Sequence, residues 1–182
     1  MSEELGAVTI GGGDQELSGA MPAVAGQLFR DCIARVPSAV HVITTDGEAG
    51  RCGFTATAFA SVSDDPPTVL VCLNRKSSQN PIFKANGRFA VNLMAAGTQA
   101  IADVFAGRAG LSMAERFTAG HWDTLVTGAP VLAGAIGTMD CLLVEVAEVG
   151  THTVMFGRVV GIRTDDPTGA VLTYHDRRYG QS

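Results

Sequence analysis

The chain has 182 residues, of which 46% are hydrophobic and 17% charged, and its mean hydropathy is +0.22. This is the length of about one domain and a composition that can bury a core, which excludes wholesale disorder. Lys and Arg number 13 against 18 Asp and Glu, so the net charge is −5 and a nucleic-acid or membrane-surface partner is disfavoured. Neither a membrane-spanning apolar stretch nor a secretion signal is recognised, so we expect a cytoplasmic protein.

The N-terminal segment differs in composition from the rest of the chain. Residues 1–25 are rich in Gly, Glu and Ser and are expected to form a flexible arm, whereas 26–182 are expected to form one domain. The ordered part begins with a predicted helix that ends before Pro37. One face of this helix carries Leu28, Ile33 and Val36.

Later segments are rich in β-branched and aromatic residues and are bounded by turn residues, which predicts strands. These segments are 39–45, 51–62 (one strand, or a strand entering a loop), 68–73, 89–93, 141–149, 151–162 and 170–174. The apolar run 68–73 is expected to be buried on both faces, and Gly150 is expected to turn a hairpin. Short helices are expected over 78–86 and 98–117, the second interrupted at two glycines. Sequential strands joined by tight turns favour an antiparallel barrel over a doubly wound parallel sheet.

The cysteines and histidines, which are the residue types that form disulfides or bind metals in many proteins, are widely separated in this sequence. No two of the four cysteines form a CxxC pair, so we expect reduced cysteines that pack as small hydrophobic residues. The four histidines lack the close spacing of a local metal site, and no metal is expected. The cysteines are Cys32, Cys52, Cys72 and Cys141, and the histidines are His41, His121, His152 and His175.

Two clusters of small polar residues are the candidate site. The first contains Thr55, Ala56, Thr57 and Ala58, and Ser61 and Ser63 plausibly extend it. The second, residues 74–80, follows a predicted buried strand and opens a predicted helix; it includes Asn74, Ser77 and Ser78 beside Arg75 and Lys76. Hydroxyl and amide groups next to cations at a helix start suit a phosphate group. The alternative is an ordinary capped helix start.

The sequence resembles a known family, the short-chain flavin reductases, which are the reductase components of two-component flavin-dependent monooxygenases. The resemblance extends over about residues 28–180. It is carried by Gly53–Asn74, Phe105-Ala106-Gly107-Arg108, Gly128-Ala129-Pro130-Val131-Leu132, Gly150-Thr151-His152 and Tyr174–Tyr179. Many members have Gly-Asp-His where this chain has Gly150-Thr151-His152, and the Thr form marks the hydroxyphenylacetate-type branch.

The resemblance implies a mainly β fold: a flavin-binding split β-barrel of about six strands in a Greek key, with a few short helices, usually as a homodimer. It implies transfer of hydride from NADH or NADPH to FAD or FMN, and delivery of the reduced flavin to a separate oxygenase that hydroxylates an aromatic compound. His152 would face the nicotinamide and is the catalytic candidate. The other implied cofactor-binding residues are Thr55, Ala56, Thr57, Ala58, Ser61, Ser63, Asn74, Ser77, Ser78, Arg108, His175, Arg177 and Tyr179.

Two other functions stay open on the sequence alone. A flavin-binding protein without enzymatic activity could use the same barrel, because a fold does not determine a function. A relative of pyridoxamine-phosphate oxidase is disfavoured, because the matching positions are those of the reductases. His152 and the segment Tyr174–Tyr179 favour the enzyme.

Overall fold

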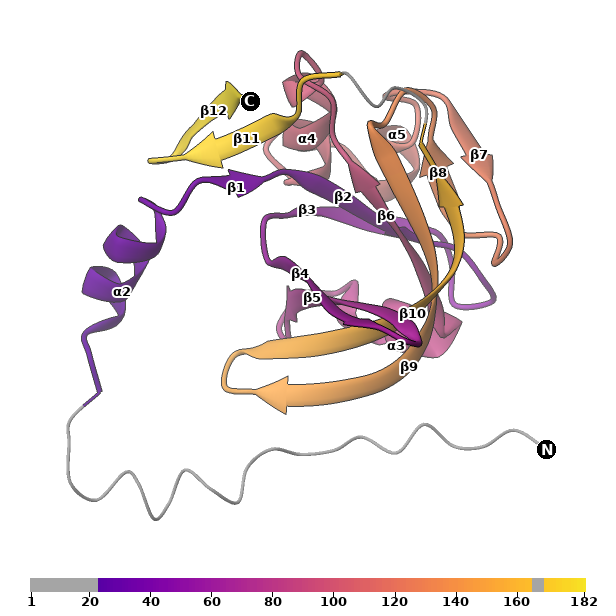
Figure 1. Ribbon diagram of the computed structural model, residues 1–182, viewed down its shortest axis with the longest axis horizontal. Coiled ribbons are helices and arrows are strands. Elements are labelled where there is room, and N and C mark those ends of the chain that lie inside the picture. The colour runs from indigo at the N-terminus through magenta and orange to yellow at the C-terminus, as the bar shows by residue number, and fades with distance from the viewer. Residues whose placement is uncertain (1–22, 165–168) are drawn as a thin grey trace.

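The computed structural model describes residues 23–164 and 169–182. Most of the predicted N-terminal arm, residues 1–22, lies outside the described residues. The described chain forms a seven-stranded antiparallel sheet, two smaller sheets and short helices (Figure 1). The strand order in the large sheet is β3-β2-β6-β9-β10-β5-β4.

The elements have the following bounds. The large sheet contains β2 (His41–Thr45), β3 (Cys52–Ala56), β4 (Phe59–Asp64), β5 (Pro67–Asn74), β6 (Arg88–Leu93), β9 (Gly137–Val149) and β10 (His152–Arg163). One small sheet pairs β1 (Ser38–Ala39), β11 (Leu172–His175) and β12 (Arg178–Gln181), and the other pairs β7 (Trp122–Thr124) with β8 (Pro130–Leu132). The helices are α2 (Gly26–Ile33), α3 (Asn80–Asn86), α4 (Gln99–Phe105) and α5 (Met113–Arg116).

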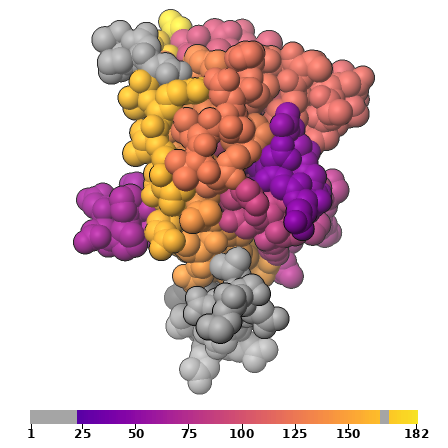
Figure 2. Space-filling view, turned by 90° about the vertical axis from the view of Figure 1, so that its right-hand side faces the viewer, coloured from indigo at the N-terminus to yellow at the C-terminus, as the bar shows by residue number. Residues whose placement is uncertain are grey.

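The two longest strands, β9 and β10, give the sheet its curvature. In Figure 1 they bend from the side of β2, β3 and β6 to the side of β4 and β5, and Figure 2 shows their outer surface in orange to yellow. The register shifts between Phe156 and Gly157, as at a β-bulge. A Cβ atom at Gly157 would lie 2.3 Å from Cζ of Phe89, so only glycine fits where the bent strand crosses this buried ring.

A close contact between α4 and β3 sets one wall of the site described below. A Cβ atom at Gly53 would lie 2.9 Å from both the carbonyl oxygen of Ile43 and Cε1 of Phe105, so the glycine lets the helix approach the strand. The Thr55 hydroxyl then donates a 2.6 Å hydrogen bond to the carbonyl oxygen of Ala102. The end of β3 and the end of α4 are therefore held side by side.

The mainly β, antiparallel architecture and the short helices confirm the predicted fold class. The hairpin about Gly150 is present, and the predicted 98–117 helix is divided as expected. The segment 51–62 is two strands with a turn at residues 57–58, rather than one strand. The predicted strand 39–45 is divided into β1 and β2, and the short strands β7, β8 and β12 were not predicted. Each of β1, β7, β8 and β12 pairs with one partner and has little periodicity of its own.

One expectation about burial is wrong for the single chain. In β5, Val69, Val71 and Leu73 are buried, but the alternate residues are partly exposed, as in a strand covered on one face. On α2, Leu28 and Ile33 of the predicted apolar face are 64% and 52% exposed, so this face does not reach the core. In Figure 1, α2 stands apart from the sheet.

Candidate functional site

Two adjoining cavities lie where β3, α4 and the β3–β4 turn meet. They share four lining residues: Thr55, Ala56, Thr57 and Ala106. Three of the four belong to the first predicted polar cluster. Small side chains at these positions let other molecules approach the backbone closely.

The larger cavity has a volume of about 490 Å³. Strands β3 and β5, the start of α3, the end of α4 and the first residue of β10 contribute to it. Its lining residues are Phe54, Thr55, Ala56, Thr57, Ala58, Cys72, Leu73, Asn74, Ser77, Gln79, Phe105, Ala106, Gly107, Arg116 and His152. This size is ordinary for a small-molecule or cofactor site. The lining includes a cation, Arg116, and no carboxylate among the described residues, which suits an anionic ligand.

One residue that lines the larger cavity, Gln79, has a buried polar atom without a partner. Oε1 of Gln79 is buried and has no hydrogen bond within the described part of the chain. Buried amide oxygens are normally hydrogen-bonded, because leaving one unsatisfied costs about 1–3 kcal/mol. A ligand that carries hydroxyl donors would satisfy this oxygen.

Gln79 belongs to the second polar cluster, and two other members of that cluster lie nearby. Asn74 and Ser77 line the same cavity and are held by local hydrogen bonds. Oδ1 of Asn74 accepts a bond from the backbone N–H of Lys76 at 2.8 Å, and the Ser77 hydroxyl accepts one from the backbone N–H of Gln79 at 3.3 Å. The Asn74 amide nitrogen and the Ser77 hydroxyl hydrogen can still donate to a ligand.

His152 is placed by a hairpin. Gly150, with a φ of 53°, turns the chain from β9 into β10, and His152 is the first residue of β10. It is paired with Asn74 of β5, and its Nδ1 lies 2.9 Å from the Thr151 hydroxyl in a hydrogen bond. The imidazole is exposed and lines the larger cavity.

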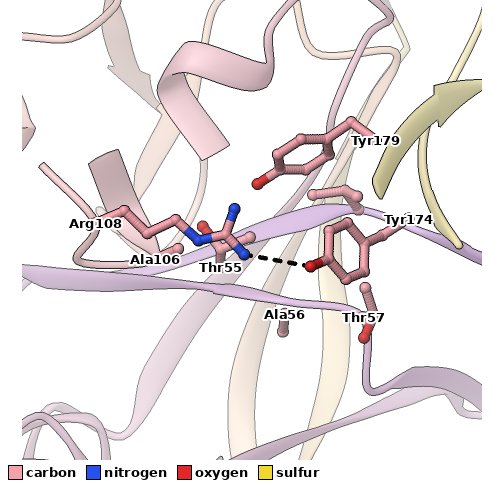
Figure 3. Close-up of a pocket in the computed structure, with 8 residues that line it drawn as sticks. Thr55, Ala56, Thr57, Ala106, Arg108, Tyr174 and Tyr179 are labelled. Atoms are coloured by element: carbon pink, nitrogen blue, oxygen red, sulfur yellow. Dashed lines mark hydrogen bonds between the residues drawn. The ribbon is translucent and has the colours of Figure 1, made fainter. Parts of the chain in front are cut away.

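The smaller cavity, of about 180 Å³, is shown in Figure 3. Arg108 points toward the hydroxyl of Tyr174 and donates to it at 3.3 Å. Its guanidinium also lies 5.8 Å from the ring centre of Tyr179 and donates to Asp103 at 2.7 Å. This lining combines a cation with two aromatic rings.

The electrostatics of the smaller cavity keep its groups protonated. The hydrogen bond to Tyr174 raises the pKa of Arg108, with further support from Tyr179 and Asp103. Burial raises the pKa of Tyr179 to about 12, and its hydrogen bond to Asp103 adds to the shift. Tyr179 is therefore a neutral hydrogen-bond donor near neutral pH, and Arg108 is a permanent cation.

The structure brings together most, but not all, of the predicted residues. Thr55, Ala56, Thr57, Ala58, Asn74, Ser77 and His152 share the larger cavity, and Arg108 and Tyr179 line the smaller one. The remaining five, Ser61, Ser63, Ser78, His175 and Arg177, line neither cavity. Ser61 and Ser63 lie on β4, where the Ser63 hydroxyl bonds to residue 65 within a turn. Arg177 forms an ion pair with Asp31 of α2.

The predicted set lacked several lining residues. Arg116 and Gln79 are the most informative, since the first is a cation and the second has the unpartnered oxygen. Gln79 lies within the predicted 74–80 cluster but was not assigned to the cofactor, and Cys72 alternates with the buried residues of β5, so the sequence could have indicated both. Arg116 could not be found this way, because α5 reaches the cavity only through tertiary packing.

The described residues contain no group of three or more His, Cys, Asp or Glu arranged to hold a metal ion. Within the same ranges, no helix has the length and apolar character needed to cross a membrane. The described cysteines are all free, and burial raises the pKa of Cys52 and Cys141 to about 12.

Comparison with known proteins finds relatives whose names all describe flavin-reducing enzymes. FMN reductase (NADH) RutF of Ancylobacter novellus is 47% identical over 168 residues, covering 91% of each chain. BorF, the flavin reductase component of a bacterial two-component tryptophan halogenase, superposes with a TM-score of 0.79 at 28% identity, covering 86% of this chain and 98% of BorF. The NADH:FAD oxidoreductase SgcE6 of Streptomyces globisporus, solved with NAD and FAD fragments, gives a TM-score of 0.79 at 27% identity, covering 89% and 97%.

The family assignment rests on a match that spans most of the chain. The model of the flavin reductase like domain matches residues 33–182, which include both cavities and the hairpin that carries His152. This match and the relatives confirm the resemblance that the sequence motifs indicated, together with its split-barrel fold. The chain belongs to the flavin reductase-like domain family.

Proposed function

We propose that this protein is an NADH-dependent flavin reductase that reduces FMN or FAD and supplies it to a separate oxygenase. The observation that carries the proposal is the larger cavity, with small residues along β3, hydroxyl and amide groups near α3, a cation, and His152 at its edge. The unpartnered Oε1 of Gln79 fits a ligand with a chain of hydroxyl groups such as the ribityl chain of a flavin. The residues present therefore fit the cofactor.

Two groups of residues would hold the flavin, one at its ring system and the other at its ribityl chain and phosphate. The wall from Thr55 to Ala58 offers small side chains and backbone groups to the ring system. Asn74, Ser77 and Gln79 offer hydrogen bonds to the ribityl hydroxyls and phosphate, and Arg116 offers positive charge. When bound, flavin accepts the hydride that NADH donates, so the protein itself needs no nucleophile.

The dinucleotide would be positioned by groups at the edge of this cavity. We place His152 on the nicotinamide side, where its ring can orient the reacting carbon, and orientation alone can account for a large part of a rate. The smaller cavity shares its wall with the larger one, and Arg108 there can bind an anionic part of either ligand. The rings of Tyr174 and Tyr179 beside it offer stacking surfaces.

The direct test mixes the purified protein with NADH and FMN or FAD and follows nicotinamide absorbance. The enzyme is expected to oxidise NADH catalytically, with turnover that depends on flavin concentration. A flavin-binding protein without activity would bind flavin and leave NADH unchanged, and that result would refute the proposal. Steady-state constants for both flavins and for NADH and NADPH would define the preferences.

The phosphate assignment is tested by a pair of neighbouring serines. Ser77→Ala is expected to weaken flavin binding about tenfold, or about 1.4 kcal/mol, which is the scale of one hydrogen bond to a charged group. Ser78→Ala is the matched control, because Ser78 is exposed and lines neither cavity. Fluorescence titration with FMN measures both affinities. Equal affinities of the two variants would contradict the role of Ser77.

The oxygenase partner is part of the proposal. BorF serves a halogenase of tryptophan, an aromatic compound, and the sequence motifs resemble those of reductases that serve aromatic hydroxylases. We therefore propose an oxygenase with an aromatic substrate. The free cysteines fit a reducing compartment, and we propose the cytoplasm as the location.

We propose a homodimer, supported by the uncovered apolar residues of α2 and of the turn that follows it. Leu28, Phe29, Ile33 and Val36 are all more than half exposed in the single chain, and a second copy would bury them. Sedimentation at micromolar concentration is expected to give twice the 18.8 kDa chain mass. Phe29→Glu should shift the protein toward monomer, whereas Val126→Glu, at a residue 68% exposed elsewhere, should not. A monomeric unsubstituted protein would contradict the dimer.

A further inference from the structure

The hairpin that carries His152 has little apolar packing at its tip. Val149 is 48% exposed, and residues 150–152 are exposed as well. Hairpin ends of this kind open easily, because few buried contacts resist the opening. A residue whose ring must stay within a fraction of an ångström of its working position needs another restraint.

Arg75 supplies three contacts to this tip. Its backbone N–H donates to the carbonyl oxygen of Thr151 at 3.0 Å. Its side chain donates from Nη1 to the carbonyl oxygen of Gly150 at 3.2 Å and from Nε to the carboxylate of Glu148 at 2.9 Å. The guanidinium is thus bonded to residues before and within the turn, and the residue after that turn is His152.

Glu148 is anchored from other directions as well. Its carboxylate accepts bonds from Nζ of Lys84 on α3 at 2.5 Å and from the Thr153 hydroxyl at 2.9 Å. Burial raises the pKa of Glu148, but these bonds and the charges of Lys84 and Arg75 outweigh it and keep the pKa below its ordinary value. Glu148 is therefore charged at neutral pH and is a fixed partner for Arg75.

The same network reaches the flavin side of the site. The buried Asn80 donates to the Thr153 hydroxyl at 2.9 Å and to the carbonyl oxygen of Asn74 at 3.4 Å. Asn74 lines the larger cavity and is paired with His152. These bonds therefore fix the position of the hairpin tip relative to the end of β5, which lines the larger cavity.

We propose that Arg75 is a positioning residue for hydride transfer, which fixes the hairpin tip through Glu148 and the Gly150 carbonyl and so holds the His152 imidazole at the cavity. The inference rests on the proposed role of His152. Arg75 does not line the larger cavity but a neighbouring one of about 480 Å³, together with Asn74, Lys76, Gly150 and Thr151. Its effect on flavin reduction would pass through His152, and the double substitution below separates this from a direct contact with the dinucleotide.

The test is a double-substitution cycle on the full chain. Arg75→Met keeps much of the side-chain length and removes the donors; it is expected to slow anaerobic reduction of bound flavin by NADH about tenfold. In a His152→Ala background, Arg75→Met should cause no further loss, because the residue through which it acts is gone. Arg158→Met is the matched control, since Arg158 is an exposed arginine farther along β10, and it should react as the unsubstituted protein does.

The outcomes separate this inference from the proposed function. A normal rate of flavin reduction in Arg75→Met would overturn the positioning role and leave the reductase assignment intact. The same holds if the rate loss in the double variant is the product of the losses in the two single variants. A normal rate in His152→Ala would overturn the role of His152 and this inference with it. If Arg75→Met melts well below the unsubstituted protein, Arg75→Lys replaces it in the same cycle. It keeps the charge opposite Glu148 but lacks the planar guanidinium that reaches Glu148 and Gly150 from two separate nitrogens. A partial loss of rate is therefore expected, with no further loss in the His152→Ala background.

Discussion

His152→Ala is expected to slow flavin reduction by NADH tenfold to a hundredfold, about 1.4–2.7 kcal/mol of transition-state stabilisation. The imidazole lines the larger cavity from the first position of β10, where it can orient the nicotinamide without contributing to flavin binding. Misplacement of the reacting carbon by about 1 Å is costly in rate, whereas the flavin affinity is expected to depend on the groups around Ser77. Anaerobic stopped-flow over a range of NADH concentrations measures the effect.

The controls for this variant are its fold and its flavin affinity. Both should match the unsubstituted protein, because His152 is exposed and its only described side-chain bond is to the neighbouring Thr151. Substitutions of exposed residues usually change stability by less than about 0.5 kcal/mol. An unchanged reduction rate at every NADH concentration would remove His152 from the site.

Acid is expected to destabilise the protein through His41. This side chain is 4% exposed on β2, it packs against the ring of Phe59 at 4.5 Å, and its Nδ1 has no partner within the described residues. Burial lowers the pKa of His41 to about 4, and bonds with the backbone at Ala56 and Ala39 offset only part of that shift. The unfolded chain therefore takes up a proton near the ordinary pKa of 6.5, well before the folded chain does.

The stabilisation linked to this residue is complete above pH 6.5 and is lost as the pH falls toward 4. Its upper limit is about 3 kcal/mol, from 1.36 kcal/mol per pKa unit. Denaturant unfolding across that range measures it. His41→Gln should flatten this part of the profile, whereas His121→Gln, at a side chain that is 83% exposed, should not. A profile that His41→Gln leaves unchanged would contradict the expected linkage.

Much of the fold was predictable because the strands have local signals. The β-branched run before Asp46-Gly47, the hairpin at Gly150 and the glycine-divided helix at 98–117 each depend on residues close together in the chain. The clusters around Thr55 and Asn74 were recognisable for the same reason, since their polar residues are contiguous. Their assignment to a flavin site came from the family motifs, because hydroxyl-rich segments alone also occur as ordinary strands and caps.

The sequence by itself determined a mainly β antiparallel domain, two polar segments and a histidine after a hairpin turn. Only the tertiary structure decided which of these meet. Pairing of β5 with β10 brings Asn74 beside His152, 78 residues away in the chain, and α5 adds Arg116. Strand order likewise decided that Ser61 and Ser63 lie on an edge strand, away from the cavity. Local periodicity reports which face of a strand is apolar, but the neighbours of that strand depend on pairings between distant segments.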